Sequence, residues 1–184
     1  MEVKLVNIPN ILTVIRLILI PIFIYYYSIG QPIIALGIYL VAGVTDVLDG
    51  YIARRFNMST KLGTVLDPLA DKLMLIAALG CLTYSQLIPQ WVLYVVLLKE
   101  LALIIGAAIM YFGHINRVIP SNVFGKVATL VFYIAVATSL LEAKPIYRDA
   151  TMTGAVVITF IAFCNYLYLY YRDHPKRDVN QLGS

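Results

Sequence analysis

The chain has 184 residues, of which 61% are hydrophobic by type and only 13% are charged. Soluble domains average about 45–50% apolar and about 25% charged residues. Charge this sparse cannot cover a water-facing surface. Together with the mean hydropathy of +0.84, it excludes a cytosolic enzyme, a disordered chain and a nucleic-acid-binding module. The net charge of +4 fits basic side chains beside an anionic membrane leaflet.

Six apolar segments follow one another along the chain, and each is long enough to cross a bilayer as a helix of about 20 residues. Glycines, prolines and polar residues that favour turns separate the segments. Six such helices use about 120 residues and leave only short loops, so we predict one all-α membrane domain spanning residues 1–184. The predicted membrane helices cover residues 10–28, 32–54, 63–84, 89–112, 121–141 and 150–171.

Basic residues are unevenly divided between the loops, and this division predicts how the chain lies in the membrane. The loops near 29–32 and 85–90 carry no charge. Because positive charge is retained in the cytoplasm, we expect both termini and the basic loops to be cytoplasmic. These basic residues are Arg54, Arg55, Lys61, Arg117, Lys126, Arg172, Lys176 and Arg177.

Four aspartates lie in two neighbouring apolar segments. Asp46 and Asp49 are three residues apart and share one face of the second helix. Asp67 and Asp71 are four residues apart and share one face of the third. The turn between the two segments is short, so the helices should be antiparallel neighbours. All four carboxylates then converge at the cytoplasmic ends of these helices.

An ionisable side chain at membrane depth costs about 3 kcal/mol or more, so such residues indicate function. Asp46 and Asp49 also lie toward the C-terminal end of their helix, where the helix dipole disfavours an anion. Two divalent cations would cancel the four negative charges. Carboxylate oxygens with no histidine or cysteine nearby suit Mg²⁺, Mn²⁺ or Ca²⁺ better than zinc.

Two other interpretations of the aspartates remain open. They can cap helices or pair with nearby basic residues, although one such pair would be more ordinary than two matched helical pairs. They can also line an ion path, in which a carboxylate cluster binds transported Na⁺ or H⁺. A small cation transporter is therefore the alternative of another class.

Small residues complete the hairpin around the aspartates. Gly50, Ala53 and Gly63 allow close helix approach, and Gly50 directly follows Asp49, so backbone can also come close to a ligand. Arg54 lies one turn beyond Gly50 and can pair with a phosphate through its planar fork of N–H groups.

These residues form one pattern, Asp46-x-x-Asp49-Gly50-x-x-Ala53-Arg54, then Gly63 after eight residues, Asp67 after three and Asp71 after three. The pattern resembles the signature of the CDP-alcohol phosphotransferases at every position. The resemblance implies six transmembrane helices, a homodimer and a multi-pass protein of the cell membrane with its active site facing the cytoplasm. It also implies transfer of a phosphatidyl group from CDP-diacylglycerol to an alcohol, with release of CMP.

The same resemblance implies roles for individual residues. Asp71 would be the catalytic base that takes the proton of the acceptor hydroxyl. Two divalent cations, Mg²⁺ or Mn²⁺, would be held by Asp46, Asp49, Asp67 and Asp71. The cytidine nucleotide would be bound by Asp46, Gly50, Ala53, Arg54 and Gly63.

The opening stretch Asn7-Ile8-Pro9-Asn10-Ile11-Leu12-Thr13, with Arg16, resembles the phosphatidylglycerophosphate synthase and CMP-forming cardiolipin synthase branch. Asn7, Asn10, Thr13 and Arg16 recur every three residues as a polar stripe on one helix face. Helix–helix hydrogen bonding and a wall of the acceptor cavity are both consistent with this stripe.

The fourth apolar segment bears on the identity of the acceptor. Phosphatidylglycerophosphate synthases typically show Arg-Glu in the fourth segment and a further arginine two turns on. Here the pair is Lys99-Glu100, the later cation is absent, and both residues should face protein or a polar cavity rather than lipid. We predict glycerol-3-phosphate as acceptor, giving phosphatidylglycerophosphate, with phosphatidylglycerol in a cardiolipin synthase as the alternative. Candidate acceptor-binding residues are Arg117, Lys126, Asn10 and Arg16.

Overall fold

The structure is a computed structural model that describes residues 8–56, 61–112 and 123–172. Within those ranges it contains six α-helices and no strand, which confirms the predicted all-helical fold. Five helices begin and end within a few residues of the predicted bounds. The helices are α1 (Ile8–Ser28), α2 (Pro32–Arg55), α3 (Lys61–Tyr84), α4 (Gln90–Phe112), α5 (Val123–Leu140) and α6 (Pro145–Arg172).

Helix α6 begins at Pro145, five residues before the predicted start at residue 150. Proline is well tolerated in the first turn of a helix, because the N–H that it lacks would have no helical partner there and its fixed φ suits the helix. Pro32 opens α2 in the same way. Pro145 therefore starts the last helix rather than only interrupting the chain before it.

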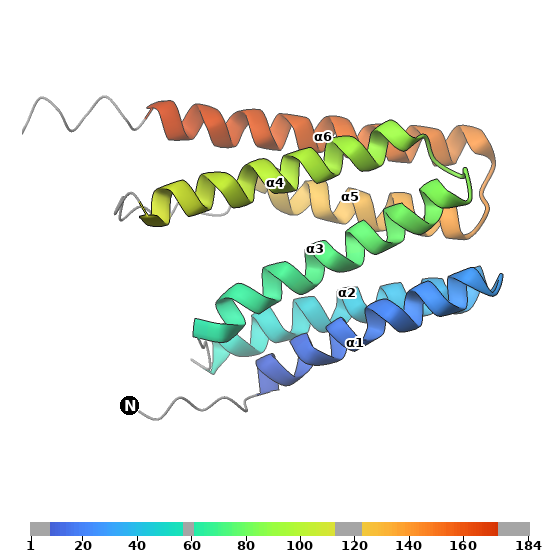
Figure 1. Ribbon diagram of the computed structural model, residues 1–184, viewed down its shortest axis with the longest axis horizontal. Coiled ribbons are helices and arrows are strands. Elements are labelled where there is room, and N and C mark those ends of the chain that lie inside the picture. Colours follow the sequence, from blue (N-terminus) through green and yellow to red (C-terminus); the bar gives the residue numbers. More distant parts are fainter. Residues whose placement is uncertain (1–7, 57–60, 113–122, 173–184) are drawn as a thin grey trace, which may run out of the picture.

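Three tight turns connect α1 to α2, α3 to α4 and α5 to α6 at one end of the bundle (Figure 1). Each has one residue with positive φ: Gly30 at 73°, Gln86 at 56° and Glu142 at 50°. The backbone hydrogen bonds have the same pattern at all three turns. At the first turn the Gly30 N–H donates to the Tyr27 carbonyl at 3.1 Å, and the Gln31 N–H donates to the Tyr26 carbonyl at 3.0 Å. This is the Schellman arrangement, which closes a helix and reverses the chain.

The helices form two groups of three, with α1, α2 and α3 on one side and α4, α5 and α6 on the other (Figure 1). Helix α1 packs closely on α2 and α3, and α5 packs on α6. Within the first group, α3 is the helix nearest to the second group. It runs obliquely and also contacts α4 and α5. The end of α2, the start of α3 and the start of α1 all lie at the end of the bundle opposite the three tight turns (Figure 1).

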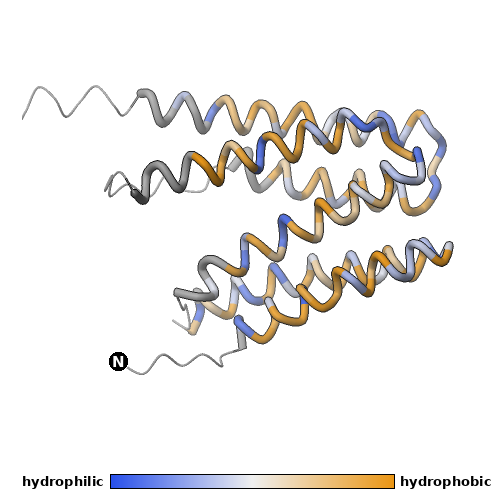
Figure 2. Tube along the Cα trace, in the orientation of Figure 1, coloured by the Kyte–Doolittle hydropathy of each residue, from blue (hydrophilic) through white to orange (hydrophobic). Residues whose placement is uncertain are grey.

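Hydrophobic residues predominate along the helices (Figure 2), and their side chains both fill the interior and cover much of the outside. Phe23, Tyr39, Met74 and Leu79 are almost completely buried. Many large apolar side chains are exposed, far more than a soluble monomer shows, among them Ile33, Val47, Leu98 and Phe160. Among the described residues, three stretches are long and apolar enough to cross a membrane, namely Pro9–Ser28, Pro32–Ala53 and Pro145–Asn165.

Candidate active site

The four aspartates are carried by the last part of α2 and the first half of α3, which meet at one end of the bundle (Figure 1). Asp49 is buried, whereas 34% of the Asp46 side chain is exposed. Asp67 and Asp71 are half-buried. The i, i+3 and i, i+4 spacings place the two members of each pair on one face of their helix.

A buried arginine from α1 lies against the aspartates. Arg16 is completely buried, and its Nη1 is 2.8 Å from Asp46 Oδ1. Its Nη2 forms an ion pair with Asp49 Oδ2, and Nη1 also donates to the Asp67 backbone carbonyl at 3.3 Å. One guanidinium therefore ties α1 to both α2 and α3.

A threonine one turn earlier on the same face of α1 completes these contacts. Thr13 is completely buried, and its hydroxyl contacts Asp67 Oδ1 and the Pro9 carbonyl, the latter at 3.1 Å. Of the predicted polar stripe, Thr13 and Arg16 thus make helix–helix contacts. Asn10 lies half-buried on the same helix, and Asn7 lies outside the described residues.

Among the described residues, no three His, Cys, Asp or Glu side chains are gathered closely enough to hold a metal ion. Arg16 and Thr13 contact three of the aspartates, as described above. The donor chemistry nevertheless fits a hard divalent cation, because every candidate ligand is a carboxylate. Three carboxylates against one guanidinium leave two negative charges uncompensated, and Asp71 adds a third. A cation would offset that surplus.

The predicted nucleotide residues lie at the same end of the bundle. Gly50 and Ala53 are half-buried on α2, just beyond Asp49, and Gly63 is buried in the first turn of α3. The side chain of Arg54 lies outside what the structure describes. So do Arg117 and the side chain of Lys126, two of the predicted acceptor residues, and their roles stay predictions.

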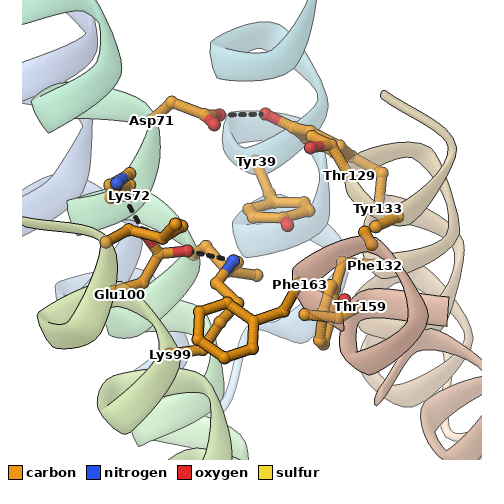
Figure 3. A pocket seen from close by; sticks show the side chains of 14 residues that line it. Tyr39, Asp71, Lys72, Lys99, Glu100, Thr129, Phe132, Tyr133, Thr159 and Phe163 are labelled. Carbon is orange, nitrogen blue, oxygen red and sulfur yellow. Dashed lines mark hydrogen bonds and ion pairs between the residues drawn. The ribbon is translucent and has the colours of Figure 1, made fainter. Parts of the chain in front are cut away.

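Asp71 faces a cavity of about 250 Å³ between the two halves of the bundle (Figure 3). Glu100 is buried there between two lysines, with Oε2 at 2.6 Å from Lys72 Nζ and Oε1 paired with Lys99. This confirms that the Lys99-Glu100 pair faces a polar cavity. Further lining residues from the other helices are Tyr39, Thr129, Phe132, Tyr133, Thr159 and Phe163.

Sequence patterns do not indicate the contacts of two residues in this region. Tyr133, one of 14 tyrosines, donates a hydrogen bond from its hydroxyl to Asp71 Oδ1 at 3.3 Å. Lys72 pairs with Glu100 of the next helix and not with an aspartate. Both contacts join residues that are distant in sequence, so no local sequence pattern predicts them.

Comparison with known proteins agrees with this geometry. The profile of the family described as CDP-alcohol phosphatidyltransferase matches residues 6–161. The chain belongs to this family. The resemblance inferred from the aspartate motif is confirmed, and the protein is a membrane-associated transferase of phospholipid biosynthesis. Members of the CDP-alcohol phosphatidyltransferase family generally use a divalent metal.

Relatives with three different names match most of the chain. A probable phosphatidylglycerophosphate synthase of Mycobacterium tuberculosis (strain H37Rv) is 32% identical, covering 92% of this chain and 84% of the relative. The CDP-diacylglycerol–glycerol-3-phosphate 3-phosphatidyltransferase of Bacillus subtilis is 33% identical, covering 87% and 93%. Human cardiolipin synthase (CMP-forming) is 34% identical, covering 85% of this chain and 49% of the relative.

The Arg16 contacts predict a large effect on stability. Arg16→Met keeps the aliphatic bulk but leaves buried Asp49 without its counter-charge. Breaking one partner of a buried ion pair costs about 3–5 kcal/mol, so the midpoint of thermal unfolding in detergent with EDTA should fall clearly.

Arg148→Met is the matched control, because Arg148 pairs at 3.4 Å with a largely exposed Asp149. Surface pairs contribute about 0–1 kcal/mol. Equal shifts in the two variants would contradict a structural role for Arg16.

Proposed function

We propose that this enzyme transfers the phosphatidyl group of CDP-diacylglycerol to glycerol-3-phosphate, forming phosphatidylglycerophosphate and CMP. The observation that carries the proposal is the cavity in which Asp71 lies near two lysines that share one glutamate. Names of relatives such as the Bacillus subtilis enzyme support the same acceptor.

The aspartate end of the bundle would hold the CDP-diacylglycerol diphosphate. Two divalent cations, Mg²⁺ or Mn²⁺, held by Asp46, Asp49, Asp67 and Asp71, would neutralise charge on the diphosphate and on the departing CMP. Gly50, Ala53, Arg54 and Gly63 would bind the cytidine nucleotide beside them.

Asp71 is the residue best placed to act as base. Its carboxylate lies on the wall of the cavity that Lys72 and Lys99 also line. It would take the proton of the acceptor hydroxyl as the hydroxyl oxygen bonds to the phosphorus that carries diacylglycerol. The bond from that phosphorus to the bridging oxygen then breaks, and CMP leaves with the oxygen.

Lys72 and Lys99 would bind the acceptor phosphate. The two ammonium groups share the one Glu100 carboxylate, so a positive charge beside Glu100 can meet a phosphate, and Asp71 on the same cavity balances it. The fourth segment has no second basic residue two turns after Lys99. Lys72, from α3, would supply that second positive charge. Arg117, Lys126, Asn10 and Arg16 remain proposed contributors.

A second acceptor is favoured by the apolar part of the same cavity. Phe132, Phe163 and Leu103 line it, and apolar walls suit a lipid acceptor such as phosphatidylglycerol. The cardiolipin synthase function is therefore the alternative, and the human relative carries that name. Membership of a transferase family removes the reason to interpret the aspartates as the ion path of a transporter.

The proposal includes the membrane topology. Six spans would place both termini and the aspartate end on the cytoplasmic side of the cell membrane, where the basic loops lie. This orientation brings the active site to the compartment that holds soluble glycerol-3-phosphate. We also propose a homodimer, as the family resemblance implies.

The acceptor assignment predicts a selective defect. Lys99→Gln removes one charge-assisted contact, which contributes about 1.5–3 kcal/mol, so the KM for glycerol-3-phosphate should rise about tenfold or more. The KM for CDP-diacylglycerol should stay nearly unchanged. CMP release measured against each substrate tests this, with Lys144→Gln at the exposed α5–α6 turn as control. Wild-type protein that ignores glycerol-3-phosphate but consumes phosphatidylglycerol would establish the alternative.

The base assignment predicts that Asp71→Asn, which is nearly isosteric, lowers turnover by about 10²-fold or more. Binding of CDP-diacylglycerol should persist, because the amide fills the same space and Asp46, Asp49 and Asp67 would still hold the cations. The control is Asp149→Asn, an exposed aspartate at the opposite end of the bundle. Near-normal turnover of Asp71→Asn would remove Asp71 from this role.

The metal assignment predicts that EDTA abolishes transfer and that added Mg²⁺ or Mn²⁺ restores it. Asp46→Ala should also weaken CDP-diacylglycerol binding, because the diphosphate is held through the cations. EDTA saturated beforehand with Mg²⁺ is the control for non-specific effects of the chelator. Transfer that persists after thorough chelation contradicts the assignment.

A further inference from the structure

We propose that Tyr133 is a positioning residue that orients the carboxylate of Asp71 for proton transfer. This inference rests on the proposed role of Asp71 as base. The Tyr133 hydroxyl donates to Asp71 Oδ1 at 3.3 Å (Figure 3). A donor on one carboxylate oxygen fixes the plane of the group and leaves Oδ2 to face the acceptor hydroxyl.

The ring of Tyr133 is held in place by α2. A Cβ added at Gly43 would lie only 2.6 Å from Tyr133 Cε1 and 2.9 Å from Cζ. The Tyr133 ring therefore lies directly against the helix backbone, in space that any other residue at position 43 would fill.

A second aromatic residue of α2 packs against the same ring. The Tyr39 and Tyr133 ring centroids are 4.9 Å apart, with planes tilted by 38°, a favourable aromatic geometry. Tyr39 is itself almost fully buried. Gly43 and Tyr39 are four residues apart on one face of α2, so together they restrict where the Tyr133 hydroxyl can point.

Three helices thus contribute to the hydrogen bond on Asp71 Oδ1. Tyr133 comes from α5, Asp71 from α3, and the residues that hold the ring come from α2. Tyr133 also lines the acceptor cavity. A direct contact with the acceptor would change its binding, whereas orientation of Asp71 would change only the rate of the chemical step, and this difference separates the two roles.

Tyr133→Phe keeps the ring and removes the hydroxyl. We expect kcat to fall about tenfold, with the KM values of both substrates and the thermal unfolding midpoint nearly unchanged. Tyr147→Phe, on an exposed tyrosine of α6, is the control. An unchanged kcat, or a loss confined to the KM of the acceptor, would overturn the proposal.

A second pair of variants tests the same geometry without touching the hydroxyl. Gly43→Ala places a methyl group where the ring lies, so the ring must move and the hydroxyl leaves Asp71. Its kcat should fall as in Tyr133→Phe, and combining the two changes should add little. Gly37→Ala is the matched control, because a Cβ there meets nothing within 4 Å. Equal activity of the two alanine variants would contradict the proposal.

The double variant Asp71→Asn/Tyr133→Phe separates failure of this inference from failure of the proposed function. If Tyr133 acts through Asp71, removing its hydroxyl should not reduce the residual activity of Asp71→Asn further. A further tenfold loss means that Tyr133 acts elsewhere. Near-normal turnover of Asp71→Asn alone overturns the base assignment, and with it the premise of this inference.

Discussion

The buried guanidinium of Arg16 bonds to two carboxylates of α2 and to the backbone of α3, and these bonds determine how the first three helices meet. Apolar helix faces give little specificity inside a membrane, because lipid tails are as apolar as the helices, so polar contacts have more influence there. Removing the arginine would leave buried carboxylates unpaired. The Arg16 guanidinium thus shapes the aspartate site and also holds α1 against α2 and α3.

The four aspartates are equivalent in the sequence motif but not in the structure. Asp46, Asp49 and Asp67 are in contact with α1, through Arg16 and Thr13. Asp71 instead lines the cavity and accepts a hydrogen bond from α5. This division agrees with the proposed separation of roles, in which Asp71 alone would act on the acceptor hydroxyl.

The sequence predicted the helices well because each is a long apolar run that ends at turn-forming residues, and only the start at Pro145 was missed. Helical spacing also predicted that the aspartates share inward faces. It did not predict the partners of Arg16, because a contact between residues 33 positions apart has no local signature. Adjacent residues such as Lys99 and Glu100 need not meet on a helix, yet Glu100 binds both Lys99 and Lys72, because all three side chains turn into one cavity.

The aspartate motif and most of the cavity wall are carried by different helices. Helices α2 and α3 carry the whole aspartate motif, whereas most of the cavity wall comes from α4, α5 and α6. Under the proposed roles, substitutions in α4, α5 and α6 during evolution would exchange one acceptor alcohol for another and leave the aspartate motif intact. One ancestral scaffold divided in this way can diversify into enzymes that make different membrane lipids, and a single sequence can then resemble two of them about equally.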